Sequence, residues 1–163
     1  MANVKLSKSE RIIRSLIQHY NSSRYWKYRS KVINSGGGFN YLRLLYIKKC
    51  DAFNKASLGT HIGFGAHFGS IPNFPHGLYG IIVTHNAIIG SDCTIYHNVT
   101  IGEGSGGAPK IGNNVLIGAG AIIIGKIEIG NNVKIGAGCI VTMDIPDNAT
   151  VVMEKPRIIV KDT

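Results

Sequence analysis

Hydrophobic residues recur every six positions along most of the chain after residue 80. An aliphatic residue starts each group of six, and a second small or medium apolar residue follows four positions later. This period fits neither the 3.6 residues of a helical turn nor the two-residue alternation of an isolated strand. It is typical of a parallel β-helix, whose coils have short flat sides and tight corners. The residues predicted to face the interior are Val83, Ile89, Ile95, Ile101, Ile111, Ile117, Ile123, Ile129, Ile135 and Val141, followed by Ala87, Cys93, Val99, Val115, Ala121, Ile127, Val133 and Cys139.

Asparagines and glycines stand where the corners of such a coil are expected. Both residue types tolerate a positive φ, which tight corners require. The predicted corner asparagines are Asn86, Asn98, Asn113, Asn114, Asn131 and Asn132. Cys93 and Cys139 fall on the interior pattern, and with Cys50 they form an odd set without metal-type spacing. Free cysteines, and a sequence without a secretory signal or a membrane-spanning run, predict a cytoplasmic protein.

The pattern before residue 56 predicts helices instead. Ser7 and Glu10 form a capping box, and the apolar residues from Ile12 to Tyr20 then fall on one helical face. A second, shorter helix is expected around Tyr41 to Lys49, after a turn at the Ser-Gly-Gly-Gly stretch of residues 35–38. We therefore divide the chain into a helical N-terminal region, 1–55, and a β-helix domain, 56–163.

Charge separates the same two regions. The 163 residues carry a net charge of +9, with twelve Lys and Arg against two acids in residues 1–60 and six against seven in residues 61–163. Such basic helices are commonly a solvated face, and contact with an anionic membrane surface or an acidic substrate carrier is the alternative. Nucleic acid is not expected, because no recognised binding motif accompanies the charge.

The repeats IGSDCT, IGNNVL, IGAGAI, IGNNVK and IGAGCI resemble those of the hexapeptide-repeat acyltransferases. Between residues 76 and 152 the sequence is similar to the serine acetyltransferase branch of that superfamily, which includes enzymes that acetylate bacterial surface polysaccharides. The resemblance implies a mainly β fold, a left-handed parallel β-helix assembled as a homotrimer. It also implies acetyl-CoA as co-substrate and no required metal.

The six-residue frame is interrupted first between Phe68 and Val83, which places His76 in irregular backbone. The resemblance implies that His76 is the general base. A histidine that titrates near neutrality can take the proton of an acceptor hydroxyl and return it to a leaving thiolate. His97 and His85 are kept as reserve catalytic or acceptor-binding residues. His61 and His67 raise the alternative of a γ-type carbonic anhydrase, but their spacing does not match its zinc ligands.

The second interruption is the stretch GEGSGGAPK, where four extra residues stand between Ile101 and Ile111. Its glycines allow close backbone approach and are expected to leave amides free for a ligand or an oxyanion. The resemblance implies that this loop runs beside the pantetheine arm of acetyl-CoA. The residues it assigns to the cofactor are Gly102, Gly104, Lys110, Ala119, Lys134, Ala137 and Arg157.

The chain departs from the serine acetyltransferase pattern where that branch holds its amino acid. Pro75 replaces the Asp before the catalytic His, and Gly107 and Ala108 replace an Arg-His pair. His61 falls near the place of the Asp that supports the base. We therefore expect a saccharide acceptor, such as a surface or capsular polysaccharide precursor, modified at the inner face of the membrane or in the cytoplasm. The alternatives are serine O-acetylation and a non-catalytic β-helix that serves as an assembly protein.

Overall fold

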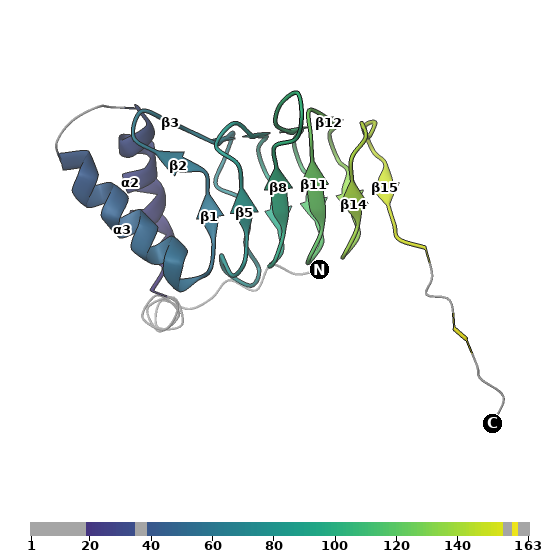
Figure 1. Ribbon diagram of the computed structural model, residues 1–163, viewed down its shortest axis with the longest axis horizontal. Helices are drawn as coiled ribbons and strands as arrows, with labels where there is room; N and C mark the ends of the chain where they lie inside the picture. The colour runs from purple at the N-terminus through teal and green to yellow at the C-terminus, as the bar shows by residue number, and fades with distance from the viewer. Residues whose placement is uncertain (1–18, 35–38, 155–157, 160–163) are drawn as a thin grey trace.

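The computed structural model describes residues 19–34, 39–154 and 158–159, and shows a parallel β-helix with two α-helices at one end (Figure 1). The helices are α2 (Ser22–Asn34) and α3 (Phe39–Phe53). The strands are β1 (Ser57–Leu58), β2 (Thr60–His61), β3 (Phe64–Gly65), β4 (His67–Phe68), β5 (Ile82–Val83), β6 (Ile88–Ile89), β7 (Thr94–Ile95), β8 (Thr100–Gly102), β9 (Lys110–Ile111), β10 (Leu116–Ile117), β11 (Ile122–Ile124), β12 (Glu128–Ile129), β13 (Lys134–Ile135), β14 (Ile140–Val141) and β15 (Thr150–Val151).

Three parallel sheets form the sides of the coil. The β8 sheet has the order β1-β5-β8-β11-β14, the β9 sheet β12-β9-β6-β4, and the β10 sheet β15-β13-β10-β7. Ile82 pairs with Thr100 and Ile122 pairs with Ile140, in each case eighteen residues apart, which is three groups of six. The predicted mainly β, parallel β-helical fold is confirmed.

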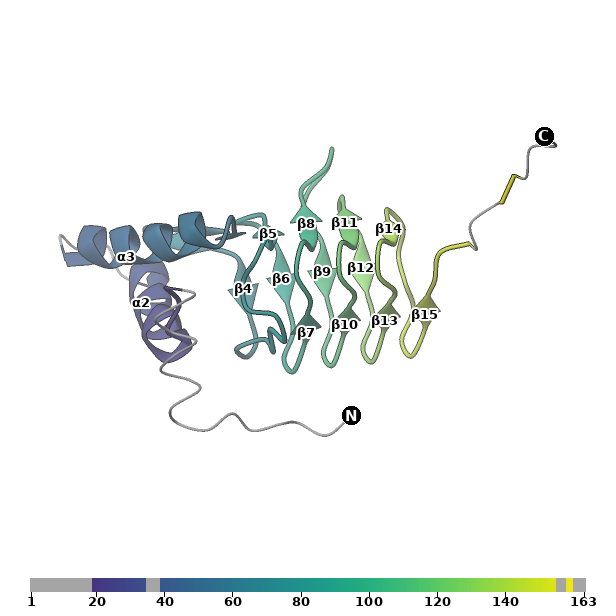
Figure 2. The ribbon, with the colours of Figure 1, turned by 90° about the horizontal axis from the view of Figure 1, so that it is seen from below.

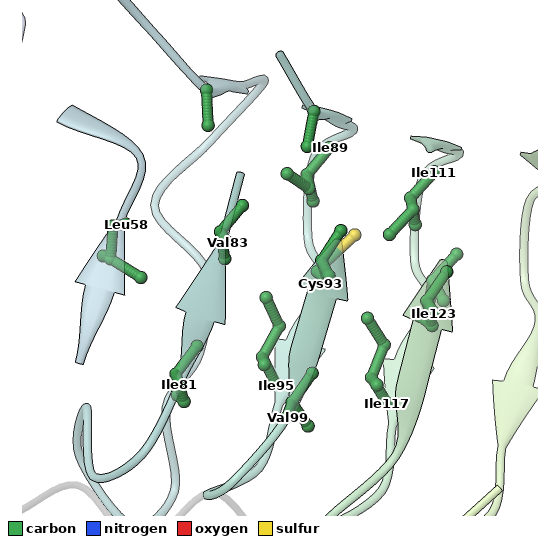
Figure 3. Close-up of a cluster of buried hydrophobic side chains, with 14 of the residues drawn as sticks. Leu58, Ile81, Val83, Ile89, Cys93, Ile95, Val99, Ile111, Ile117 and Ile123 are labelled. Carbon is green, nitrogen blue, oxygen red and sulfur yellow. The ribbon is translucent and has the colours of Figure 1, made fainter. Parts of the chain in front are cut away.

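The interior is the one that the six-residue pattern predicts. Every residue of both predicted rows is buried, with at most 7% of its surface exposed. Figure 3 shows labelled members of both rows, such as Ile95 and Val99, pointing into the space that the strands enclose. Each coil buries several aliphatic side chains, and each such side chain contributes about 1.5–3 kcal/mol of transfer free energy. The fold therefore depends on apolar rows stacked in register.

The corners differ in part from the expectation. Three of the predicted asparagines adopt a positive φ, namely Asn98, Asn114 and Asn132. The other three do not have a positive φ, and their side chains form hydrogen bonds with other segments. Asn113 Oδ1 accepts a hydrogen bond from the amide of Ser91, and Asn131 Oδ1 accepts one from the amide of Asn113, both at 2.8 Å. Asn86 donates to Glu103.

The helices pack against the first coil. Tyr25, Val32 and Ile47 are fully buried in the same apolar cluster as the strands. Arg29 of α2 donates to the side chain of Thr60 and to the carbonyl oxygens of Leu58 and Ala66. Burial lowers the pKa of the Arg29 guanidinium to about 10. This buried arginine ties α2 to the end of the β-helix.

The predicted helix around Tyr41–Lys49 is confirmed and is longer, spanning Phe39–Phe53. The predicted helix that starts at Ser7 and the turn at 35–38 lie outside the described residues, apart from His19 and Tyr20. Helix α2 was not predicted. Its first turn is capped by Asn21, whose Oδ1 accepts from the amide of Arg24 at 3.0 Å. Neither of the described helices has the length and apolar composition that a membrane crossing requires.

Candidate active site

The irregular segment between β4 and β5 is held by buried residues and carries His76 on its surface. His67 of β4 pairs with Ile88 of β6, twenty-one residues later, so this segment holds three residues more than the corresponding part of a regular coil. Leu78 and Ile81 of the extra segment are fully buried. The amide of Gly77 donates to the carbonyl oxygen of Phe74 at 3.0 Å, closing a tight turn. This turn carries His76 on the surface.

His76 and His97 meet at this turn. Their Nδ1 atoms lie 2.7 Å apart, and their ring centroids are 4.7 Å apart. The ring of Tyr96 meets the His76 ring edge-on, with the centroids at 5.5 Å. His76 is exposed, whereas His97 is half-buried. The geometry therefore makes His76 the accessible ring of a hydrogen-bonded histidine pair.

His97 also heads a row of small residues on one corner of the coil. The amide of Gly120 donates to the carbonyl oxygen of His97 at 3.0 Å, and the amide of Gly138 donates to that of Ala119 at 2.8 Å. His97, Ala119 and Ala137 are therefore equivalent positions on successive coils, and we call them the corner row. The row leads along the surface to the histidine pair.

The GEGSGGAPK loop has the predicted length. Thr100 pairs with Ile122, twenty-two residues later, so four residues are added between β8 and β9. Figure 2 shows the loop projecting from the coil beyond β8. Gly104 and Gly107 form two backbone hydrogen bonds with each other, at 3.1 and 3.3 Å. The expectation of free glycine amides is therefore wrong for these two residues, because the loop folds back on itself as a tight hairpin.

Glu103 fastens the base of this loop. Its carboxylate accepts hydrogen bonds from Asn86 Nδ2 at 3.1 Å and from Thr84 Oγ1 at 3.3 Å. The loop follows the C-terminal end of β8, whereas His97 precedes its N-terminal end. One chain therefore places the loop and the histidine pair at opposite ends of the β8 strand.

His85 does not join the histidine pair. It lies between β5 and β6, and its ring makes edge contacts with those of His61 and Phe64, each at 5.5 Å. The His61 ring is stacked on Phe64 at 4.8 Å, and burial, together with Lys48 and His85, lowers the pKa of His61. The described ranges hold no cluster of three side chains suited to a metal ion.

The residues assigned to the cofactor are spread over several sides. Gly102 lies on β8 opposite Ile124. Lys110 lies on the β9 sheet and forms an exposed ion pair with Glu128 at 3.1 Å. Lys134 lies on the β10 sheet, three residues before Ala137, in a polar groove with Asn114 and Asn132. Arg157 lies outside the described residues. Lys134 thus lies on the side of the coil that leads into the corner row, and Lys110 lies on another side.

Sequence reasoning missed Tyr96, Glu103 and Lys126. The Cβ and Cγ atoms of Lys126 lie close to Gly107, each 3.5 Å from the place that a β-carbon on that glycine would take. The signal for Glu103 was available, because it is the one acid in the glycine-rich stretch. Tyr96 and Lys126 had no signal, since their neighbours come from the stacking of coils.

Comparison with known proteins identifies the repeats and their relatives. The family described as bacterial transferase hexapeptide (six repeats) matches residues 108–142. The putative colanic acid biosynthesis acetyltransferase WcaB of Escherichia coli strain K12 is 44% identical over 103 residues, which cover 61% of this chain and 63% of that protein.

Solved structures agree in fold over more of the chain. Serine acetyltransferase isoform 3 of Entamoeba histolytica, in complex with cysteine, matches with a TM-score of 0.69 and 29% identity, over 99% of this chain and 56% of that one. Serine acetyltransferase of Brucella abortus strain S19, in complex with coenzyme A, matches with a TM-score of 0.64 and 28% identity, over 91% and 56%. The chain thus spans less than two thirds of the length of these relatives. The chain is a parallel β-helix in which residues 108–142 match the hexapeptide repeats; it is similar in sequence and in fold to serine acetyltransferases, and in sequence to a colanic acid biosynthesis acetyltransferase.

Proposed function

We propose that this chain transfers an acetyl group from acetyl-CoA to a hydroxyl of a saccharide. The observation that carries the proposal is the histidine pair at the head of the corner row. A base lies exposed at one end of a path of small side chains, in a fold whose relatives are acetyltransferases. The pantetheine arm would lie along Ala119 and Ala137, with Lys134 available for a phosphate.

The reaction needs one base and no covalent enzyme intermediate. Acetyl-CoA supplies the acetyl group as an activated thioester. His76 Nε2 takes the proton of the acceptor hydroxyl as its oxygen attacks the thioester carbonyl carbon. The carbon–sulfur bond then breaks, and the imidazolium returns its proton to the leaving thiolate. Amides of the GEGSGGAPK loop of a neighbouring subunit, other than those of Gly104 and Gly107, are candidates for stabilising the oxyanion.

A neutral acceptor fits the residues at the positions where the serine acetyltransferase pattern holds its amino acid, which are Pro75 beside His76 and the loop residues Gly107 and Ala108 at the other end of β8. Pro75 offers neither a charge nor a backbone donor, and the Gly107 amide already donates to the carbonyl oxygen of Gly104. Ala108 has no polar side-chain atom. A zwitterion such as serine needs both of its charges matched when it leaves water, whereas a sugar hydroxyl needs hydrogen bonds alone.

Serine remains the second candidate, and one observation favours it. The Lys126 side chain lies close to Gly107, where the serine-specific branch has an arginine. Its ammonium can supply a counter-charge for a carboxylate. A Lys126→Met variant separates the two acceptors, because it should raise the KM for serine and leave that for an uncharged glycoside unchanged.

An acceptor screen tests the proposal directly. Release of free CoA thiol is measured with acetyl-CoA and a panel of glycosides and serine, with His76→Ala as the background. We expect kcat/KM to be highest for an uncharged glycoside. If serine is acetylated efficiently and the sugars are not, serine is the acceptor. If thiol release equals the His76→Ala background with every acceptor, the result favours the assembly-protein alternative.

We also propose that the β8 sheet is the face through which the chain forms a homotrimer. Its outward residues include Ile82 and Ile140, which are 41% and 68% exposed. The β9 sheet instead presents Lys110 and Glu128, and the β10 sheet presents Lys134. An uncharged apolar side is what a subunit interface requires. Joining subunits there would also allow the loop of one chain to complete the site of another.

We further propose that the basic N-terminal region contacts an anionic membrane surface, and the exposed residues of helix α3 support this alternative. Phe39, Leu42 and Leu45 are 77%, 67% and 66% exposed, and Lys48 and Lys49 follow on the same helix. The sole acid of α3, Asp51, is buried. Exposed apolar side chains beside basic ones are typical of surfaces that bind acidic lipid headgroups.

Vesicle binding tests this contact. The protein should sediment with anionic vesicles at low salt and be released at high salt, since the attraction is electrostatic. A Lys48→Glu, Lys49→Glu variant should bind less, and a Lys110→Glu variant on the β9 sheet serves as its matched control. If the protein sediments with neither anionic nor neutral vesicles, the basic helices are a solvated face and do not bind membranes.

A further inference from the structure

We propose that His97 is the positioning residue for His76: it accepts the Nδ1 proton of His76 and so keeps the Nε2 atom of His76 free to act as base. The inference rests on the proposed acetyl transfer and adds a second residue to its machinery. It follows from the contact between the two rings, whose Nδ1 atoms are 2.7 Å apart.

A proton count shows what this contact requires. Two Nδ1 atoms at hydrogen-bond distance hold one proton between them, because two protons would clash and none would leave two lone pairs facing each other. In the neutral pair, the ring that donates from Nδ1 has a bare Nε2, and the ring that accepts at Nδ1 carries its proton on Nε2. The pair therefore contains a single basic Nε2 atom.

The surroundings assign that basic atom to His76. Its ring is exposed on a turn, whereas His97 is half-buried between β7 and β8. The flanking residues Ile95 and Val99 are fully buried, and the His97 carbonyl oxygen accepts from the amide of Gly120 on the next coil. His97 thus sits on the rigid coil, and the more accessible ring depends on it for its orientation.

His97 also acts on the charged state of the reaction. When His76 Nε2 takes the proton of the acceptor hydroxyl, His76 becomes an imidazolium whose Nδ1–H points at the lone pair of a neutral His97. The hydrogen bond is then charge-assisted and stronger than in the neutral pair. When His76 returns the proton to the thiolate, the neutral pair is restored with all protons accounted for.

Within the described ranges no carboxylate contacts either ring of the pair, so a neutral imidazole takes the position of the usual acidic partner. A carboxylate would stabilise the imidazolium more strongly. A neutral acceptor fixes the same tautomer and adds no negative charge beside the acceptor sugar. This difference is open to direct measurement, because the tautomer of a histidine is set by the hydrogen bond at its other nitrogen.

The test combines nitrogen NMR with kinetics on the full chain labelled with ¹⁵N-histidine. At about pH 8.5, above the ordinary titration range of histidine, the wild type should show His76 with a protonated Nδ1 and a bare Nε2, and His97 with the reverse. His97→Ala should let His76 exchange between its tautomers. His97→Asn should restore the fixed tautomer, because Asn Oδ1 occupies the place of His Nδ1 and accepts a hydrogen bond.

The kcat of each variant should depend on whether His76 keeps its fixed tautomer. We expect His97→Ala to lower kcat by about 10- to 100-fold, by analogy with the cost of removing a partner that orients a metal-binding histidine, with the KM for acetyl-CoA unchanged. His97→Asn should recover most of this loss. His67→Ala, which removes an exposed histidine on β4, is the matched control for both measurements.

Three results would overturn the inference. The first is a His76 tautomer that stays fixed in His97→Ala. The second is a wild type in which His76 carries its proton on Nε2. The third is a His97→Asn variant that keeps the fixed tautomer and still loses as much turnover as His97→Ala. A wild type with the fixed tautomer and no acetyl transfer to any acceptor would contradict the proposed function, while supporting the hydrogen-bonded pair.

Discussion

The imidazole of His76 is the group on which the proposed chemistry depends most. A positioned general base contributes about 10²- to 10⁴-fold to a rate, so His76→Ala should lower kcat by roughly that factor. CoA affinity, measured by calorimetry, should stay near the wild-type value, because the ring acts on the acceptor. A nearly active His76→Ala variant beside an inactive His97→Ala variant would show that His97 is the base.

A second prediction at this scale concerns Asp51. Its Oδ1 accepts a 2.7 Å hydrogen bond from the Tyr25 hydroxyl, while its Oδ2 is buried without a hydrogen-bond partner among the described residues. Burial raises the pKa of Asp51 to about 6, from an ordinary value of 3.8. The folded state therefore binds a proton that the unfolded state has already lost between these two pH values. Stability should fall as pH rises from about 4 to about 6.

The neutral Asp51→Asn variant isolates this effect. Urea unfolding of both proteins across the window should give a difference in unfolding free energy that changes with pH by up to about 3 kcal/mol. The wild type should lose stability relative to the variant as pH rises. Parallel profiles would mean that Asp51 titrates in the folded protein as it does in the unfolded chain.

Single residues also show what sequence can and cannot predict. The interior positions were predictable because each depends on a period that is local in sequence. The contact between His76 and His97 was not, because residues twenty-one apart meet there only through an irregular segment whose path no period sets. The two rings were identified separately as candidates, and their pairing required the fold.

Among the elements, the corner asparagines form ladders that should matter for stability. Asn132 has a φ of 58°, accepts from Asn114 Nδ2 at 2.9 Å and donates to Asn148 Oδ1 at 3.0 Å. Asn132→Val combines a strained positive φ with the loss of both hydrogen bonds, so it should cost about 2–4 kcal/mol.

The Asn132→Gly variant serves as the matched control, because glycine keeps the φ without strain and loses only the ladder. It should be destabilised less than the valine variant in thermal or urea unfolding. Equal stabilities for the two variants would mean that the backbone conformation of this corner adds nothing to the effect.

Helices and loops were predicted unevenly for physical reasons. Helix α3 carries enough apolar residues to be recognised, whereas the buried face of α2 includes the charged Arg29, which interrupts its apolar stripe. The four extra residues of the GEGSGGAPK loop were predictable, because ten residues separate Ile101 from Ile111 where the repeat has six. Its closure through Gly104 and Gly107 did not, because that closure depends on φ values of glycines that the sequence leaves free.

For the whole molecule, light scattering should give the mass of three chains. Ile140→Lys places a charge on the uncharged β8 sheet, so it should shift the protein toward monomer and lower the activity. Ile88→Lys, on the β9 sheet where charges already stand, is the matched control. A wild type that is monomeric and fully active would contradict a site shared between subunits. The division into regions 1–55 and 56–163 stays a prediction.

The stacking of coils has a consequence for how the chain folds. Residues that pair across coils are mostly eighteen to twenty-two positions apart, so each new coil closes a short loop onto one already formed. Folding can therefore spread from a nucleus coil by coil, with free energies that add along the axis as in a one-dimensional chain. The first coil, from β1 to β5, has seven extra residues and is held by Arg29 of α2, so it is the slowest to close in this scheme. The histidine pair would then be assembled late, after the regular coils beside it have become rigid.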